Sequence, residues 1–192
     1  MDYTIRKATE DDKLNIARAA SYSFEETFRV FTKDMERMAK VYENHVATDR
    51  FFVAEQDGEF LRIIAHGNRE GRVLGSTKEE CIKHLGALRG RLAFSVIKKE
   101  QMRPHPYPAA TGYIDIVGVL PKARGKGLAK ELLTALITAN PQYDEFILDV
   151  DSGNVSAVKS YMKFGFVEYK RGPAIPFSKR ARLFMKYIPK RG

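Results

Sequence analysis

Hydrophobic and polar residues recur along this chain with two different periods. Short runs that alternate, or that are continuously apolar, predict strands, and apolar residues three or four positions apart predict helices. Strands are expected at about 3–8, 50–55, 59–67, 113–120, 144–150, 166–170 and 183–188. Helices are expected at about 9–24, 32–44, 76–96, 128–139 and 154–164. This order predicts an α/β (α+β) fold, in which a mixed sheet of about seven strands carries helices on both faces.

Short-range signals refine this arrangement. Asp57-Gly58 between two apolar runs is typical of a β-hairpin turn. Ser76 and Thr77 each precede a glutamate by three residues, a capping pattern that predicts the start of a helix. Gly86 and Gly90 then lie one turn apart inside that helix. The pair either allows another element to pack closely or marks a break, and close packing is favoured.

The stretch 112–136 carries the strongest chemical signal. An apolar strand over 113–120 is stopped by Pro121, and a basic, glycine-rich turn over 122–127 leads into a helix. A helix N-terminus presents unpaired N–H groups and a partial positive charge, and glycines let an anion approach the backbone. The stretch therefore predicts a phosphate-binding turn between a strand and a helix.

The spacing within this turn separates three phosphate-binding motifs. A nucleotide P-loop places Ser or Thr after Gly-Lys to hold magnesium, whereas here Gly127 is followed by Leu128. A dinucleotide fingerprint needs a third glycine where this chain has Lys130. Both motifs are therefore disfavoured.

The pattern that remains is Arg124-x-x-Gly127-x-Ala129 after an apolar strand, and here the chain resembles the GNAT superfamily of acetyl-CoA-dependent N-acyltransferases. The resemblance implies a mostly antiparallel sheet and acetyl-CoA as the cosubstrate. The edge of the strand, at Val117, Gly118 and Val119, is expected to pair with the pantetheine arm. The pyrophosphate of coenzyme A is expected to lie on Arg124, Gly125, Lys126, Gly127, Leu128, Ala129 and Lys130.

A second signature of the same family follows the strand at 144–150. It reads Asn154-x-x-Ala157-x-x-x-Tyr161-x-x-x-Gly165-Phe166. The resemblance implies that Asn154 bonds the cofactor arm and that Tyr161 lies beside the sulfur. Because a phenol can donate a proton to a departing thiolate, Tyr161 is the expected general acid. The alternative is a tyrosine that only packs in the core or under the cofactor.

For the acceptor side of the site, the sequence gives only candidate residues for substrate contact and for the general base. The resemblance places acceptor contacts between the first two helices, at Glu25, Glu26 and Phe28, with surface exposure or core packing as the alternatives. Tyr113 and Asp115 are two residues apart and therefore on one face of the central strand. Tyr113 is a candidate substrate contact. Asp115 is either the general base or a carboxylate that orients the substrate, with Glu25, Glu26 and a water chain as other candidate bases.

Further expectations concern the surroundings of this strand. A backbone N–H near Val117 or Gly118 is expected to stabilise the oxyanion, and Gly118 is expected to mark a β-bulge that separates this strand from the next. The loop 172–178 is another candidate for acceptor contact. His105, in a proline-rich loop beside the central strand, is expected to be a surface residue, with contact to the substrate as the alternative. The spacing of the histidines predicts no metal site: His45, His66, His84 and His105.

Length and composition bear on the number of domains, the role of the cysteine and the location of the protein. The 192 residues, 44% of them hydrophobic, are expected to form a single domain over 1–192. The connection 68–111 is expected to be a structural insertion, with an acceptor-site lid or a homodimer contact as alternatives. Cys81 is the only cysteine and is expected to be a small buried residue rather than a nucleophile. The sequence has no signal core and no apolar run of roughly 20 residues, so a cytoplasmic location without a membrane partner is expected.

The formal net charge of +9 favours anionic ligands, and coenzyme A satisfies part of that bias. The basic C-terminal segment lacks interleaved aromatic residues, so nucleic acid is not the expected partner.

The predicted function is direct transfer of an acetyl group from acetyl-CoA to a primary amine in a ternary complex. A small-molecule acceptor is slightly favoured over a protein N-terminus or lysine. The alternative is an acyl-CoA-binding regulatory or ribosome-associated module without turnover.

Overall fold

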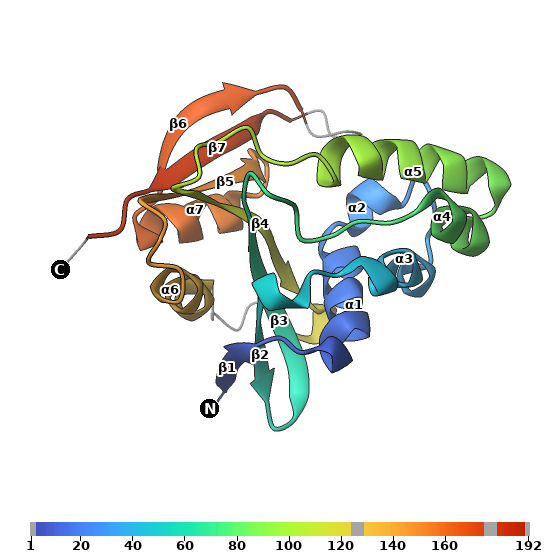
Figure 1. Ribbon diagram of the computed structural model, residues 1–192, viewed down its shortest axis with the longest axis horizontal. Coiled ribbons are helices and arrows are strands. Elements are labelled where there is room, and N and C mark those ends of the chain that lie inside the picture. Colours follow the sequence, from blue (N-terminus) through green and yellow to red (C-terminus); the bar gives the residue numbers. More distant parts are fainter. Residues whose placement is uncertain (1–2, 124–128, 175–179, 191–192) are drawn as a thin grey trace.

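Seven strands form one twisted sheet with helices on both faces (Figure 1). The computed structural model describes residues 3–123, 129–174 and 180–190. The strands are β1 (Thr4–Lys7), β2 (Phe51–Gln56), β3 (Glu59–Gly67), β4 (Thr111–Val119), β5 (Glu145–Asp151), β6 (Val167–Gly172) and β7 (Arg182–Tyr187). Their spatial order is β1-β2-β3-β4-β5-β7-β6. Only β4 and β5 pair in parallel among these described strands, so the predicted mixed, mostly antiparallel sheet is confirmed.

The helices divide between the two faces of the sheet. They are α1 (Lys13–Ser23), α2 (Glu25–Phe28), α3 (Met35–Tyr42), α4 (Lys78–Leu85), α5 (Ala87–Gln101), α6 (Ala129–Thr138) and α7 (Val155–Phe164). One buried cluster joins residues of α1 to α5 to one face of β2, β3 and β4, and a second joins α6 and α7 to the opposite face. The site described below lies where the central strands open between these two layers.

Local sequence signals explain several boundaries. Asp57 and Gly58 have φ of +52° and +75°, the left-handed pair that a tight hairpin turn between β2 and β3 requires. The Thr77 Oγ1 accepts a hydrogen bond from the Glu80 N–H at 3.1 Å, which caps α4. Gly165, with φ of +119°, ends α7. The predicted hairpin and helix ends are confirmed.

The long helix expected from residue 76 to residue 96 is wrong, because it is two helices. Gly86 has φ of +84°, a conformation that separates α4 from α5. Gly90 does serve close packing, since a Cβ there would lie 2.5 Å from the carbonyl oxygen of Cys81. One glycine breaks the helix and the other lets the two halves touch.

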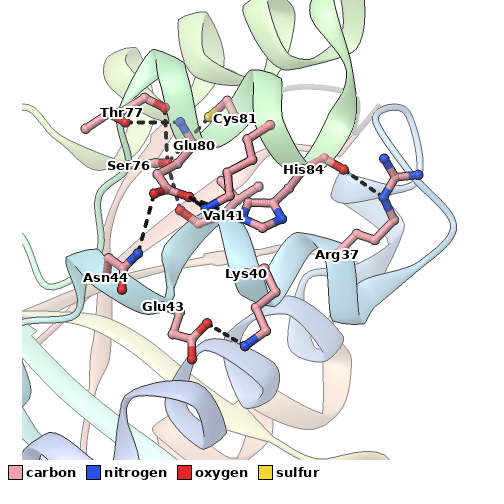
Figure 2. A network of polar contacts seen from close by, with 11 residues as sticks. Arg37, Lys40, Val41, Glu43, Asn44, Ser76, Thr77, Glu80, Cys81 and His84 are labelled. Atoms are coloured by element: carbon pink, nitrogen blue, oxygen red, sulfur yellow. Dashed lines mark hydrogen bonds and ion pairs between the residues drawn. The ribbon is translucent and has the colours of Figure 1, made fainter.

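Polar contacts tie α4 to α3 (Figure 2). The Ser76 Oγ donates to the carbonyl oxygen of Val41 at 2.7 Å, and the Arg37 Nε donates to the carbonyl oxygen of His84 at 2.7 Å. Cys81 is fully buried beside Ser76, and burial raises the pKa of its thiol. The interpretation of Cys81 as a small buried residue is confirmed.

The predicted β-bulge at Gly118 is wrong. The register between β3 and β4 shifts where Ala65 pairs with Ile116 and His66 pairs with Ile114, so Asp115 is the extra residue. Gly118 instead leaves room for the Ile63 side chain, because a Cβ at position 118 would lie 2.7 Å from the Cγ1 of Ile63.

Candidate active site

The two parallel strands of the sheet separate from one another. Pairs between β4 and β5 run from Thr111 with Glu145 to Ile114 with Leu148, and none continues beyond that point in the part of the chain that the structure describes. The remainder of β4 keeps its partner β3 on one side only. One edge of this strand is therefore open.

Backbone geometry identifies the groups that face the opening. The Leu120 N–H donates to the carbonyl oxygen of Leu61 at 3.0 Å, toward β3. Because N–H directions alternate along an antiparallel strand, Gly118 also faces β3, whereas Val117 and Val119 face the opening. The Val119 N–H donates to the Ser23 Oγ of α1 at 2.8 Å. Among the candidate oxyanion donors, the geometry favours Val117 over Gly118.

The predicted cofactor turn is only partly within the described residues. Arg124 to Leu128 lie outside them, while Ala129 and Lys130 form the first turn of α6. The Arg62 Nη2 donates to the carbonyl oxygen of Ala123 at 2.8 Å and so fixes the start of the turn. Burial lowers the pKa of Arg62.

Asn154 and Tyr161 lie at the start and near the end of α7. The Asn154 Oδ1 accepts the Ala157 N–H at 3.2 Å as a helix cap, which leaves the Nδ2 of this exposed side chain for other contacts. Tyr161 is buried against Phe166, and within the described part of the chain its hydroxyl has no hydrogen-bond partner. Burial, followed by the negative charge of Asp149, raises the pKa of Tyr161.

A cavity of about 390 Å³ adjoins the opening on the opposite face of the sheet. One wall is apolar and comes from α2, the residues that flank it and α5, with Phe24, Phe28, Phe31, Val96 and Ile97. The other wall is polar and comes from the loops before β4 and from β4 to β7. The volume lies in the range of small-molecule sites.

Only some of the predicted acceptor residues line the cavity. Phe28, Tyr113 and Asp115 line the cavity together. Glu25 and Glu26 do not line it: Glu25 pairs with Arg29 at 2.8 Å, and Glu26 is exposed. The bulge explains part of this arrangement, since it turns the consecutive residues Asp115 and Ile116 toward the same cavity.

Asp115 is held by two partners, the buried His105 and the partly buried Arg72. Its Oδ1 lies 2.7 Å from the His105 Nε2 and 2.5 Å from the Arg72 Nε. The His105 ring stacks on the Tyr113 ring, with centroids 3.6 Å apart. The expectation that His105 is a surface residue is wrong, because only 7% of its side chain is exposed.

A second polar cluster joins four elements at the other end of the cavity. The Tyr113 hydroxyl donates to the Asp149 Oδ1, and the Asp149 Oδ2 lies 3.3 Å from the Arg182 Nε. The Arg182 Nη2 donates to the Glu100 Oε2 of α5 at 3.2 Å. Burial and the adjacent Asp149 raise the pKa of Tyr113.

Sequence reasoning offered His105 only as the less favoured alternative and missed Arg72, Asp149 and Arg182. These residues are far apart in the chain and follow no motif. The two-residue period that linked Tyr113 to Asp115 is the only signal that pointed to this wall of the cavity.

Comparisons with known proteins agree with this geometry. The sequence model of the Acetyltransferase (GNAT) family matches residues 17–166, and the chain belongs to this family. Among solved structures, an N-acetyltransferase from Staphylococcus aureus Mu50 has a TM-score of 0.64 at 19% identity, over 96% of this chain and 100% of that chain. A ribosomal-protein-alanine N-acetyltransferase from Brucella melitensis has a TM-score of 0.61 at 19% identity, over 97% of this chain and 99% of that chain. At these identities the likeness shows the fold alone.

Relatives with higher identity match shorter stretches. A mycothiol acetyltransferase from Frankia casuarinae is 38% identical over 92 residues, which cover 46% of this chain and 27% of that protein. One from Paenarthrobacter aurescens is 41% identical over 68 residues, covering 34% of this chain and 20% of that protein. The matched stretches thus span about a quarter or less of these relatives.

Neither a metal-binding cluster nor a membrane-spanning helix is present among the described residues. Within residues 3–123, 129–174 and 180–190, no three or more His, Cys, Asp or Glu side chains gather as a metal site would need. The same residues include no helix with the length and apolar character needed to span a membrane.

Proposed function

We propose that the protein transfers an acetyl group from acetyl-CoA directly to a primary amine, with a small molecule as the acceptor. One observation carries the proposal: the open edge of β4 at Val117 lies between Tyr161 on one face of the sheet and the cavity at Asp115 on the other. A donor placed along this edge and an acceptor in the cavity would meet at Val117.

The described residues fit the expected cofactor. The Val117 carbonyl, which faces the opening, would accept a hydrogen bond from the pantetheine arm, and the Nδ2 of Asn154 would add another. Ala129 and Lys130 begin a helix whose N-terminus favours a pyrophosphate. When bound, acetyl-CoA supplies the activated acetyl group.

Two groups of the protein, the Val117 N–H and the Tyr161 hydroxyl, then act on the bound acetyl thioester. The Val117 N–H stabilises negative charge that develops on the carbonyl oxygen. The Tyr161 hydroxyl gives its proton to the sulfur. Its raised pKa keeps the phenol protonated and therefore able to donate.

We assign the general base to His105 rather than to Asp115. The Asp115 Oδ1 already accepts from His105 and lies 2.5 Å from the Arg72 Nε, so this oxygen is engaged by two partners. With the Nε2–H donated to Asp115, the Nδ1 of His105 is the basic nitrogen of a residue that lines the cavity. Asp115 is then a positioning residue that fixes the tautomer.

Two arguments favour a small acceptor. The relatives from Frankia and Paenarthrobacter are named mycothiol acetyltransferases, which points to a small molecule in those proteins. The cavity volume of about 390 Å³ also suits a small ligand.

A screen of primary amines tests the proposal. Release of the free thiol from acetyl-CoA is measured with small amines, polyamines, peptide N-termini and lysine peptides, and isothermal titration calorimetry measures coenzyme A binding. Acceptor-dependent thiol release is the expected result. Binding of coenzyme A without release on any amine would instead support a regulatory acyl-CoA-binding module.

A further inference from the structure

The carboxylates that line the cavity are all engaged by cations. Asp115 lies 2.5 Å from Arg72, while Asp149 and Glu100 lie 3.3 Å and 3.2 Å from Arg182. Asp149 and Glu100 share Arg182, so these three carboxylates face two arginines and one negative charge remains for an ammonium group.

One cation of the lining differs from the others. Lys170 extends from β6 over the Phe184 ring, with its Nζ 5.6 Å from the ring centroid. No carboxylate lies within ion-pair distance of Lys170 among the described residues. Lys170 is exposed, so an incoming anion can reach it without breaking an existing ion pair.

The electrostatic consequence concerns the acceptor. One negative charge remains where Glu100, Asp115 and Asp149 face only Arg72 and Arg182, which suits the amine of the acceptor. A ligand that also carries a carboxylate gives Lys170 a partner. The opposite wall, which includes Phe24 and Phe28, fits an apolar side chain.

We infer that the acceptor is a small α-amino acid with an apolar side chain, whose carboxylate is bound at the Lys170 end of the cavity. This inference rests on the proposed function and names its substrate class. The nitrogen–carbon bond to the acetyl group forms as the carbon–sulfur bond breaks. The amine proton goes to His105 and the thiolate takes the proton of Tyr161, so the products are an N-acetyl amino acid and free coenzyme A.

Matched acceptors test the carboxylate. Steady-state kinetics are measured with L-phenylalanine, L-leucine and L-methionine, each beside the amine that lacks the carboxylate: 2-phenylethylamine, 3-methylbutylamine and 3-(methylthio)propylamine. For at least one pair, kcat/KM should be at least about tenfold higher for the amino acid, as expected for hydrogen bonds to a charged group. Equal or higher kcat/KM for every decarboxylated amine would overturn the inference and leave the acetyltransferase activity standing.

A variant pair tests the place of binding. Lys170→Met should raise KM for the preferred amino acid by about threefold, the scale of an exposed ion pair, and leave the decarboxylated amine unaffected. Lys163→Met is the matched control, because Lys163 is exposed on α7 and does not line the cavity. Equal effects of the two substitutions would exclude Lys170 as the carboxylate site.

Binding without turnover separates this inference from the proposed function. Calorimetry with 3-phenylpropanoate and 4-methylpentanoate, which have the carboxylate but no amine, should show binding to the wild type that weakens in Lys170→Met. Such binding together with no acetyl transfer to any amine would uphold the site and reject the transferase activity. Absence of binding by both acids and by all three amino acids would reject the site.

Discussion

Burial determines what Tyr161 can do in this fold. Because its pKa is raised, the phenol remains protonated beyond the ordinary tyrosine value of about 10. Tyr161→Phe should lower kcat by about 10²-fold. In the wild type, kcat should show no decline from this group between pH 7 and pH 10, since the acid form persists.

The control for this measurement is Tyr187→Phe, which changes another aromatic residue packed on Phe166. If Tyr161→Phe kept the wild-type kcat at every pH, Tyr161 would be a packing residue and not the general acid.

His105 gives a second prediction at the residue scale. His105→Gln should lower kcat/KM by about 10²-fold near neutral pH, because the amine loses its base. The deficit should shrink as pH rises, since a growing fraction of the amine is then deprotonated in solution. Initial rates across pH, with His84→Gln as a control far from the cavity, measure both effects.

Asp115→Asn tests the positioning role separately. It should change the pH profile through His105 and cost less activity than loss of the imidazole itself. A His105→Gln profile that parallels the wild type at all pH values would remove His105 from the proton transfer.

These residues show where sequence reasoning reaches its limit. The position of Asp115 on the same face as Tyr113 could be predicted, because strand periodicity is a local property. Its partners could not, because Arg72 and His105 come from loops that only the folded chain brings together. The bulge at Asp115 also depends on the register with β3, which no single strand encodes.

At the scale of elements, most of the sheet could be predicted from hydrophobic patterns, and the hairpin between β2 and β3 could be predicted from Asp57-Gly58. The break at Gly86 could not be predicted, because the sequence around a glycine in a helical pattern specifies neither the φ of that glycine nor the residues that pack against it. The same ambiguity applied to Gly90. Its packing against Cys81 exists only because the chain reverses at Gly86.

Gly90 therefore carries a prediction about this helix pair. Gly90→Ala gains about 1 kcal/mol of helix propensity, but the added methyl group would lie 2.5 Å from the carbonyl oxygen of Cys81. The steric cost of this contact with the backbone should exceed the gain in helix propensity, so the free energy of unfolding should fall by about 1–3 kcal/mol. Urea denaturation measures it, and Ser95→Ala, at an exposed position of α5, is the control. A stabilised Gly90→Ala protein would contradict the packing argument.

At the scale of the whole molecule, the site depends on the contact between the two layers. The open edge of β4 faces α7 and Tyr161 on one side and the cavity under α1, α2 and α5 on the other. Donor and acceptor can thus approach from opposite faces of a single sheet. The described residues of the sequence motifs belong to α6 and α7 on the donor face, which is why the acceptor face could not be predicted to the same depth.

Folding stability is also a property of the whole molecule, and His66 links it to pH. This side chain is buried in β3 against the Tyr143 ring, and its Nδ1 has no hydrogen-bond partner among the residues that the structure describes. Burial, followed by the charge of Arg50, lowers the pKa of His66 to about 4. The unfolded chain, with a histidine pKa of about 6.5, binds this proton first as pH falls. Stability from this group is therefore present above pH 6.5 and is lost between about pH 6.5 and pH 4.

The loss across this window should approach about 3 kcal/mol in the free energy of unfolding. His66→Phe keeps a ring at the position and removes the titration, so its stability should decline less steeply over the same pH range. Urea denaturation at pH 7, 6, 5 and 4.5 measures the difference between the two proteins, from which the shared contribution of the carboxylates cancels. His45→Gln, at a partly exposed histidine, should follow the wild type. Identical slopes for His66→Phe and the wild type would mean that His66 takes up its proton in the folded protein.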